Sequence, residues 1–171
     1  MSSSFIRFKE NGFWAADGFA EAFQLLLFGE IQLQYQDTLP WLNEYKKSLA
    51  MESLPLVFGG MSMRLDETIT DDTRKTTLLD LISTIQYKIA NDPQYLTGSH
   101  LHDLRREVRH FLVGTGEFLW PTHEIERQIE EGPFSEELPA VTYQKGLDLL
   151  RMLIAGHLFF KTDTPITYWD V

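Results

Sequence analysis

The chain of 171 residues contains no cysteine. Disulfide bonds, thiolate zinc sites and cysteine nucleophiles are therefore excluded, and a reducing compartment suits the sequence. Long apolar runs are also missing, because the longest nearly apolar stretch, Met152 to Phe160, is too short to span a bilayer. The first residues carry no apolar core behind a basic region, so we expect a cytoplasmic protein without a secretory signal.

Basic residues are scarce: 15 Lys and Arg stand against 25 Asp and Glu, and the formal net charge is -10. This charge repels nucleic-acid phosphates and anionic lipids, so we expect no direct binding to nucleic acid or to a membrane. The same field speeds the encounter with a basic partner. Hydrophobic residues make up 43% of the chain, which indicates a single globular domain over residues 1–171 rather than a disordered chain.

The order of apolar residues predicts a mainly α fold of the α+β class. Asn11-Gly12 lies between two runs of aromatic and β-branched residues, which predicts a β-hairpin whose turn uses the positive φ angles of Asn-Gly. A second hairpin is the simplest interpretation of the apolar runs around Gly59-Gly60. The lysine of a phosphate-binding loop does not follow Gly60, so these glycines indicate a turn rather than a nucleotide site.

Five segments carry the 3.6-residue periodicity of helices. The predicted helices run from Gly18 to about Phe28 or beyond behind an N-cap at Asp17, from Pro40 to Met51, from Thr70 to Asp92, from a cap at Ser99 to Gly114, and from Val141 to about Phe159. The last is apolar on almost every side, which is typical of a central helix, and it places His157 toward the core. We therefore expect about five helices packed round a central C-terminal helix, with one or two small β-hairpins.

Motifs for nucleophilic catalysis are missing. The chain has no G-x-S-x-G sequence, and no Ser or Thr near a His has a recognisable acid partner. We therefore predict a protein that is not an enzyme and that binds no cofactor.

One segment nevertheless concentrates groups that can bind a metal, because three of the five histidines lie between His100 and His110. On a helix, His100, Asp103, Glu107 and His110 flank one edge of the apolar stripe, and His102 lies toward the other edge with three arginines. A metal site draws its ligands from at least two elements, and no second His-rich or Asp-rich motif completes this one. The pattern is more typical of a solvated amphipathic helix.

The dipeptide His102-Asp103 resembles the HD-domain phosphohydrolases, which are helical and use a metal. That family also needs an earlier His on another helix and a later Asp, whereas the only upstream His here is His100. A metal-dependent phosphohydrolase, with His100, His102, Asp103 and His110 as candidate ligands, is therefore the alternative hypothesis. A non-catalytic scaffold subunit is the third.

Negative charge is concentrated between Glu117 and Asp148, where eight acids and two bases leave -6 of the chain's -10. A solvated acidic face is common, but aromatic residues accompany these carboxylates. An aromatic anchor ringed by carboxylates is well suited to a basic groove on a partner. The candidate partner-binding residues are Trp120, Glu124, Glu126, Glu130, Glu131, Phe134, Glu136 and Glu137.

A small, acidic, cysteine-free chain without an active-site motif resembles the bacterial immunity proteins of toxin systems. The stretch NGFWAAD, followed by an amphipathic helix, also resembles the starts of some uncharacterised members. The resemblance implies one-to-one binding that blocks a partner's active site. We therefore predict an inhibitor of a basic protein toxin, such as a nuclease.

Overall fold

A β-hairpin opens the chain. The computed structural model describes residues 3–35, 38–53, 62–116, 123, 134 and 139–157. Strand β1 (Ser3–Phe8) pairs with β2 (Asn11–Ala16) in antiparallel register, with Phe8 opposite Asn11. The expected hairpin is confirmed, but its turn is formed by Lys9, at φ 56°, and Glu10, instead of Asn-Gly.

Gly12 has a different role from the predicted one, because it lies within β2 opposite Arg7. A Cβ atom at this position would lie only 2.5 Å from the carbonyl oxygen of Ile6 and 2.6 Å from the ring of Phe5. The glycine therefore permits a close approach of the backbone and of the Phe5 ring.

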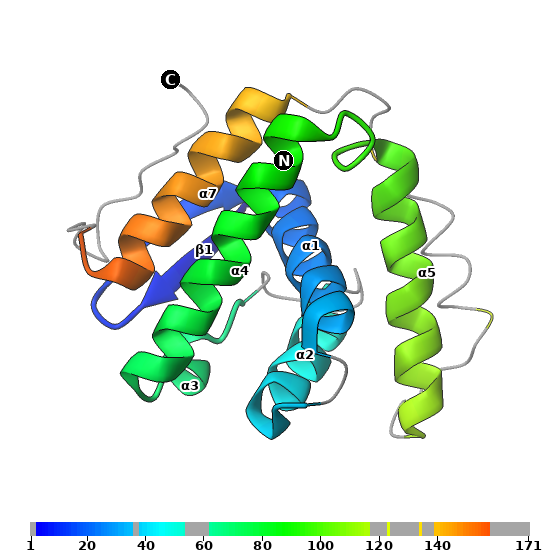
Figure 1. Cartoon of the computed structure of the whole chain (residues 1–171), viewed down its shortest axis with the longest axis horizontal. Helices are drawn as coiled ribbons and strands as arrows, with labels where there is room; N and C mark the ends of the chain where they lie inside the picture. Colours follow the sequence, from blue (N-terminus) through cyan, green and yellow to red (C-terminus); the bar gives the residue numbers. More distant parts are fainter. Residues whose placement is uncertain are drawn as a thin grey trace.

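Helices make up most of the remaining described chain, which confirms the mainly α fold with a small hairpin (Figure 1). In chain order they are α1 (Asp17–Tyr35), α2 (Pro40–Glu52), α3 (Leu65–Thr68), α4 (Asp72–Asn91), α5 (Gly98–Thr115) and α7 (Ala140–Ala155). None of the helices in the described ranges is long and apolar enough to cross a membrane.

The centre of the fold is α1, and not the C-terminal helix as we expected. All residues of α1 from Ala20 to Ile31 are buried, and α1 contacts α2, α4, α5 and both strands. Gly29 does not end this helix. A Cβ atom there would lie 2.8 Å from a methyl carbon of Leu104, so the glycine lets α5 pack closely against α1. In Figure 1, α1 accordingly lies between α4 and α5.

The C-terminal helix α7 is amphipathic. A strip of polar residues along one side of it packs against α4. Three polar residues of the strip, Gln144, Asp148 and Arg151, all hydrogen-bond with Gln86 of α4, at distances of 2.7–3.2 Å. The helix predicted from Thr70 to Asp92 by its apolar periodicity is confirmed as α4, which buries one apolar stripe. Its members Leu78, Leu81, Ile82, Ile85 and Ile89 are all buried.

The helix ends agree with the local sequence signals at α4 and differ from them at α5. Asp71 caps α4 as a helix-dipole partner, because its carboxylate accepts a hydrogen bond from the backbone N–H of Arg74 at 2.9 Å. Thr97, and not Ser99, caps α5, and its hydroxyl accepts from the N–H of His100 at 3.2 Å. Helix α5 passes Gly114 and ends before Gly116, whose φ is 66°.

His157 was predicted to face the core, and this prediction is wrong. Helix α7 ends at Ala155 instead of about Phe159, because Gly156 adopts the left-handed conformation at φ 83°. His157 is therefore exposed beyond the helix end. The second predicted hairpin lies mostly outside the described residues, and its last position, Leu65, begins helix α3 instead of a strand.

Candidate functional site

Phe134 is the one predicted partner-binding residue that the structure describes. The others lie outside the described residues: Trp120, Glu124, Glu126, Glu130, Glu131, Glu136 and Glu137. The contacts of Phe134 with the helices define the described part of the candidate site.

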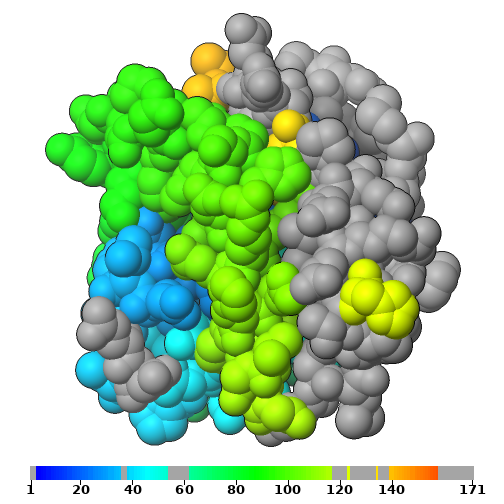
Figure 2. All heavy atoms as spheres, turned by 90° about the vertical axis from the view of Figure 1, so that its right-hand side faces the viewer, coloured from blue at the N-terminus to red at the C-terminus, as the bar shows by residue number. Residues whose placement is uncertain are grey.

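Phe134 is half-buried against α5, the helix that runs down the middle of the face in Figure 2. Its backbone N–H donates a hydrogen bond to Nε2 of His102 at 3.2 Å, and its ring meets the imidazole edge-on at a centroid distance of 5.8 Å. The Cζ atom of Arg105 lies 4.0 Å from the centroid of the Phe134 ring. Such a cation–π contact is strongest where water is excluded. Phe134 is thus attached to α5 through two side chains on one helix face.

Arg105 is itself held by a buried ion pair with Glu21 of α1. Nε donates to one carboxylate oxygen at 2.6 Å and Nη2 donates to the other at 2.8 Å. The two side chains are only 9% and 7% exposed. This bidentate geometry connects the central helix to α5 with a fixed orientation of the guanidinium.

Sequence reasoning missed this ion pair, because it placed Arg105 on the solvated side of a helix. A signal was present in the sequence. Glu21 lies within FAEAFQLLLF, where nearly every neighbour is apolar, and a carboxylate in such a helix needs a buried cationic partner. What the sequence did not contain was the identity of that partner, 84 residues away.

The electrostatics of the site follow from its burial. Burial raises the pKa of Glu21, and the hydrogen bonds and charge of Arg105 offset this only in part. Burial also lowers the pKa of His102, and the positive charges of Arg105 and Arg106 lower it further. A neutral imidazole matches the geometry, because Nε2 can accept the bond from Phe134 only when it carries no proton.

Acidification is expected to destabilise the folded protein through the protonation of His102. In the unfolded chain a His titrates near pH 6.5, and in the folded chain its pKa is lower, so protonation favours unfolding. The contribution of the neutral His102 to the stability of the fold is fully present above about pH 6.5, and it is lost as the pH falls through the folded pKa of His102. His102→Gln keeps an acceptor but cannot titrate, so we expect urea unfolding at pH 7.5 and 5.5 to show a smaller loss for this variant than for the wild type. An equal loss in both proteins would contradict the assignment.

The residues of the alternative metal site do not converge in the structure. His100 is half-buried with its ring 5.3 Å from that of Tyr95, whereas Asp103 is exposed and pairs with Arg106 at 2.8 Å. His110 is also exposed. Among the residues that the structure describes, no three His, Asp or Glu side chains are grouped so that they could hold a metal ion. The described helices therefore offer no ligand set for an HD-type phosphohydrolase.

A second buried carboxylate, Glu30 of α1, lies in a network of donors and is only 1% exposed. One oxygen accepts from Nζ of Lys88 and from the hydroxyl of Tyr95, both at 2.6 Å, and the other accepts from Gln34 at 2.8 Å. Burial raises the pKa of Glu30, but these donors together outweigh it, so the net pKa lies below its usual value. The network joins α1 to α4 and to the segment before α5, and its role is structural.

Comparisons were made with protein-family models, with curated proteins and with solved structures. No family model, no curated protein and no solved structure matches the chain. The resemblance to immunity proteins therefore stays a prediction.

Proposed function

We propose that this chain is a non-catalytic inhibitor of the immunity type, which binds one basic protein toxin, such as a nuclease, and blocks its active site. The observation that carries the proposal is the charge distribution: residues 117–148 hold -6 of the net -10. Carboxylates can hydrogen-bond the catalytic Lys, Arg or His groups of a nuclease in place of the phosphates that it normally binds. The acidic field also raises the rate of encounter with such a partner.

The attachment of Phe134 supports this proposal. Phe134 stands in the sequence between Glu130-Glu131 and Glu136-Glu137, and its backbone and ring are both bound to α5. The Glu21–Arg105 ion pair fixes α5 on the central helix beneath this contact. A recognition segment attached to a rigid element loses less conformational entropy when it binds, so more of the contact energy appears as affinity.

Reversal of two charges in the acidic stretch tests the proposal. The double variant Glu130→Lys/Glu131→Lys is expected to bind the partner at least about tenfold more weakly, because truncating or reversing central interface charges costs more than about 1.4 kcal/mol. A matched control is Asp80→Lys/Glu107→Lys, since both residues are exposed on α4 and α5 and the net charge changes by the same amount. The control is expected to retain the partner.

The measurement begins with capture of the partner on the tagged wild-type protein at about 0.15 M salt, where the Debye length is about 8 Å. The captured protein is identified, purified and titrated by calorimetry against the wild type and both double variants, and its own activity is assayed with each. Loss of binding and of inhibition in the first variant alone would support the proposal. A partner that binds both variants equally, or capture that is lost at this salt concentration, would argue that the acidic stretch is only a solvated surface.

A further inference from the structure

Asn11-Gly12 lies in strand β2 and not in the turn of the hairpin, and this placement determines its chemistry. Asn11 pairs with Phe8 at the end of the ladder, and Gly12 pairs with Arg7. The side-chain amide of an Asn is most open to attack by the next backbone nitrogen when a glycine follows, because glycine has no side chain that hinders the approach. Neither residue belongs to the acidic stretch or contacts Phe134, so this site can be tested independently of the proposed function.

The extended strand holds these two residues in an unreactive arrangement. Attack requires a rotation about the Cα–C bond of Asn11 that brings the backbone nitrogen of Gly12 up to Cγ, the carbon of the side-chain amide. In an antiparallel strand ψ is about +135°, and rotation away from this value breaks the pairing of β2 with β1. Ile6 and Phe13 are fully buried next to the site, so the middle of the hairpin opens only at the expense of the core. The site is therefore closed while the end of the hairpin keeps its register.

The packing of the hairpin requires the glycine that makes Asn11 reactive. A Cβ atom at position 12 would lie 2.5 Å from the carbonyl oxygen of Ile6, so a larger residue that would slow the attack does not fit there. Protection of the Asn11 side chain has to come from the backbone of the hairpin and from whatever holds its turn.

The turn beside the site is held by Asp66, a residue from outside the hairpin. Lys9 occupies the first central position of the turn at φ 56°, a conformation that favours glycine, asparagine or aspartate over lysine. The carboxylate of Asp66 in α3 accepts a hydrogen bond from the backbone N–H of Lys9 at 2.5 Å, and its other oxygen lies 3.5 Å from Nε of Arg7. A charged acceptor makes the stronger kind of hydrogen bond with a backbone N–H. Asp66 thus binds both the turn and the residue opposite Gly12.

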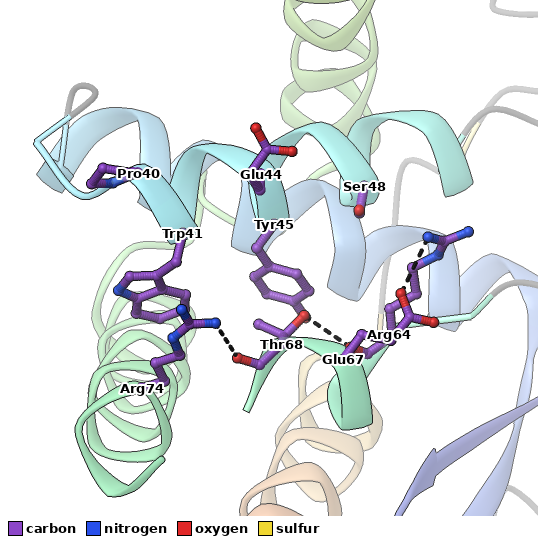
Figure 3. A pocket seen from close by; sticks show the side chains of 9 residues that line it. All are labelled: Pro40, Trp41, Glu44, Tyr45, Ser48, Arg64, Glu67, Thr68 and Arg74. Atoms are coloured by element: carbon purple, nitrogen blue, oxygen red, sulfur yellow. Dashed lines mark hydrogen bonds and ion pairs between the residues drawn. The ribbon is translucent and has the colours of Figure 1, made fainter. Parts of the chain in front are cut away.

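Helix α3, which carries Asp66, is itself bound to α4 and α2 (Figure 3). Nη1 of Arg74 in α4 donates a hydrogen bond to the carbonyl oxygen of Thr68 at 3.3 Å. Nε of Arg64, at the N-cap of α3, donates to Glu52 of α2 at 3.3 Å. The contact of Asp66 with the turn therefore ties the end of the hairpin to two helices of the main fold.

We propose that Asn11 is a self-modification site that Asp66 keeps closed. When the turn opens, the backbone nitrogen of Gly12 attacks Cγ of Asn11. The new N–Cγ bond forms, the Cγ–Nδ2 bond breaks, and Nδ2 leaves as ammonia with the proton of the Gly12 amide. Water then opens the resulting succinimide ring at one of its two carbonyl carbons, and the product is aspartate or isoaspartate. Isoaspartate places its β-carbon in the main chain, and this extra backbone atom displaces Gly12 from its position opposite Arg7, so the original register is lost.

The rate of deamidation at Asn11 in the full chain, measured by peptide mass spectrometry during incubation at mildly alkaline pH, tests the proposal. The folded wild type is expected to react at least about tenfold more slowly than the chain unfolded in guanidinium chloride, because the reaction needs a local opening. Asp66→Ala is expected to raise the rate in the folded protein about three- to tenfold, because the turn loses a hydrogen bond to a charged group. Asp66→Asn, which keeps a neutral acceptor, is expected to lie between the two. Asp80→Ala removes an exposed carboxylate on α4 and is expected to leave the rate unchanged.

Stability of the product provides a second readout. The isoaspartate form, separated from the unmodified protein by ion exchange, is expected to unfold at a lower denaturant concentration than the wild type. Asn11→Asp has the same charge without the extra backbone atom and is expected to stay close to the wild type. The proposal would be overturned if folded and unfolded chains reacted at the same rate, or if both Asp66 variants reacted no faster than Asp80→Ala. An isoaspartate form as stable as Asn11→Asp would equally overturn it.

Discussion

Glu21→Ala is expected to lower the free energy of unfolding by about 3–5 kcal/mol, because it leaves the guanidinium of Arg105 buried without its carboxylate. Both side chains are less than a tenth exposed, so bulk solvent screens the remaining charge only weakly. Phe134 depends on the same guanidinium, and its ring contact is expected to weaken in the variant. Urea unfolding followed by circular dichroism at pH 7 measures the change.

Two further variants separate the cost of an unpaired buried charge from the net contribution of the ion pair to the free energy of unfolding. Glu21→Met/Arg105→Leu replaces both partners with apolar side chains and is expected to be within about 1 kcal/mol of the wild type, or more stable, because burying two charges costs as much as their attraction returns. Asp103→Ala breaks the exposed pair with Arg106 and is expected to cost less than about 1 kcal/mol. A loss in the double variant as large as in Glu21→Ala would show that the ion pair itself stabilises the fold.

The raised pKa of Glu21 determines how its contribution to stability changes with pH. Its pKa is raised in the folded protein, mainly by burial, so the folded state binds a proton more readily than the unfolded state. The stabilising contribution of this proton is present below the unfolded pKa, about 4.3–4.5, and is lost as the pH rises through the folded pKa. Ionisation of Glu21 in the folded protein therefore costs free energy. This cost agrees with the expectation that the apolar replacement Glu21→Met/Arg105→Leu is tolerated.

Lys88→Met is expected to lower the free energy of unfolding by about 2–3 kcal/mol, because Glu30 then loses its only cationic donor among the described residues. The effect is smaller than for Glu21 because Lys88 is 33% exposed and water screens part of the interaction. Tyr95 and Gln34 remain as neutral donors. Lys145→Met on the exposed side of α7 serves as the control and is expected to change stability by less than about 0.5 kcal/mol.

Acid titration distinguishes the electrostatic effect of Lys88 on Glu30 from the effect of its packing. In the wild type the pKa of Glu30 is lowered, so its contribution to stability is present above about pH 4.5 and is lost as the pH falls through the folded pKa. In Lys88→Met, burial is opposed only by neutral donors, and the pKa of Glu30 is expected to rise. The difference in stability between the two proteins should therefore shrink as the pH falls from 6 to 4. A constant difference over this range would assign the effect of Lys88 to its packing alone.

Local sequence signals located most of the elements that the structure describes. The apolar periodicity of Leu78, Ile82 and Ile85 predicted α4, because it depends on residues within a few positions of each other. Pro40 correctly marked the first turn of α2. Gly156 was the signal overlooked in α7: it lies inside an apolar run, and the apolar period alone extended the predicted helix past it.

Other predictions depended on competition between distant segments. Asn11-Gly12 is a strong turn signal, but the strands pair so that Lys9 and Glu10 form the turn and Gly12 faces Arg7. Apolarity on nearly all sides suggested a central α7, whereas α1, which carries Glu21, Gln24 and Glu30 among its apolar residues, occupies the centre. Polar residues within a central helix are tolerated when other elements supply their partners, and sequence periodicity does not contain that information.

By itself, the sequence determined the acidity, the absence of cysteine chemistry, the mainly helical class and the concentration of carboxylates in residues 117–148, because composition and short-range periodicity suffice for these. The tertiary structure alone decided which charges are paired and which donors are left over. Glu21 meets Arg105 across 84 residues, Glu30 meets Tyr95 across 65, and the hydroxyl of Tyr45 is buried without a hydrogen-bond partner among the described residues. Burial and pairing of polar groups are set by the packing of whole helices, and they depend on contacts between residues far apart in the chain.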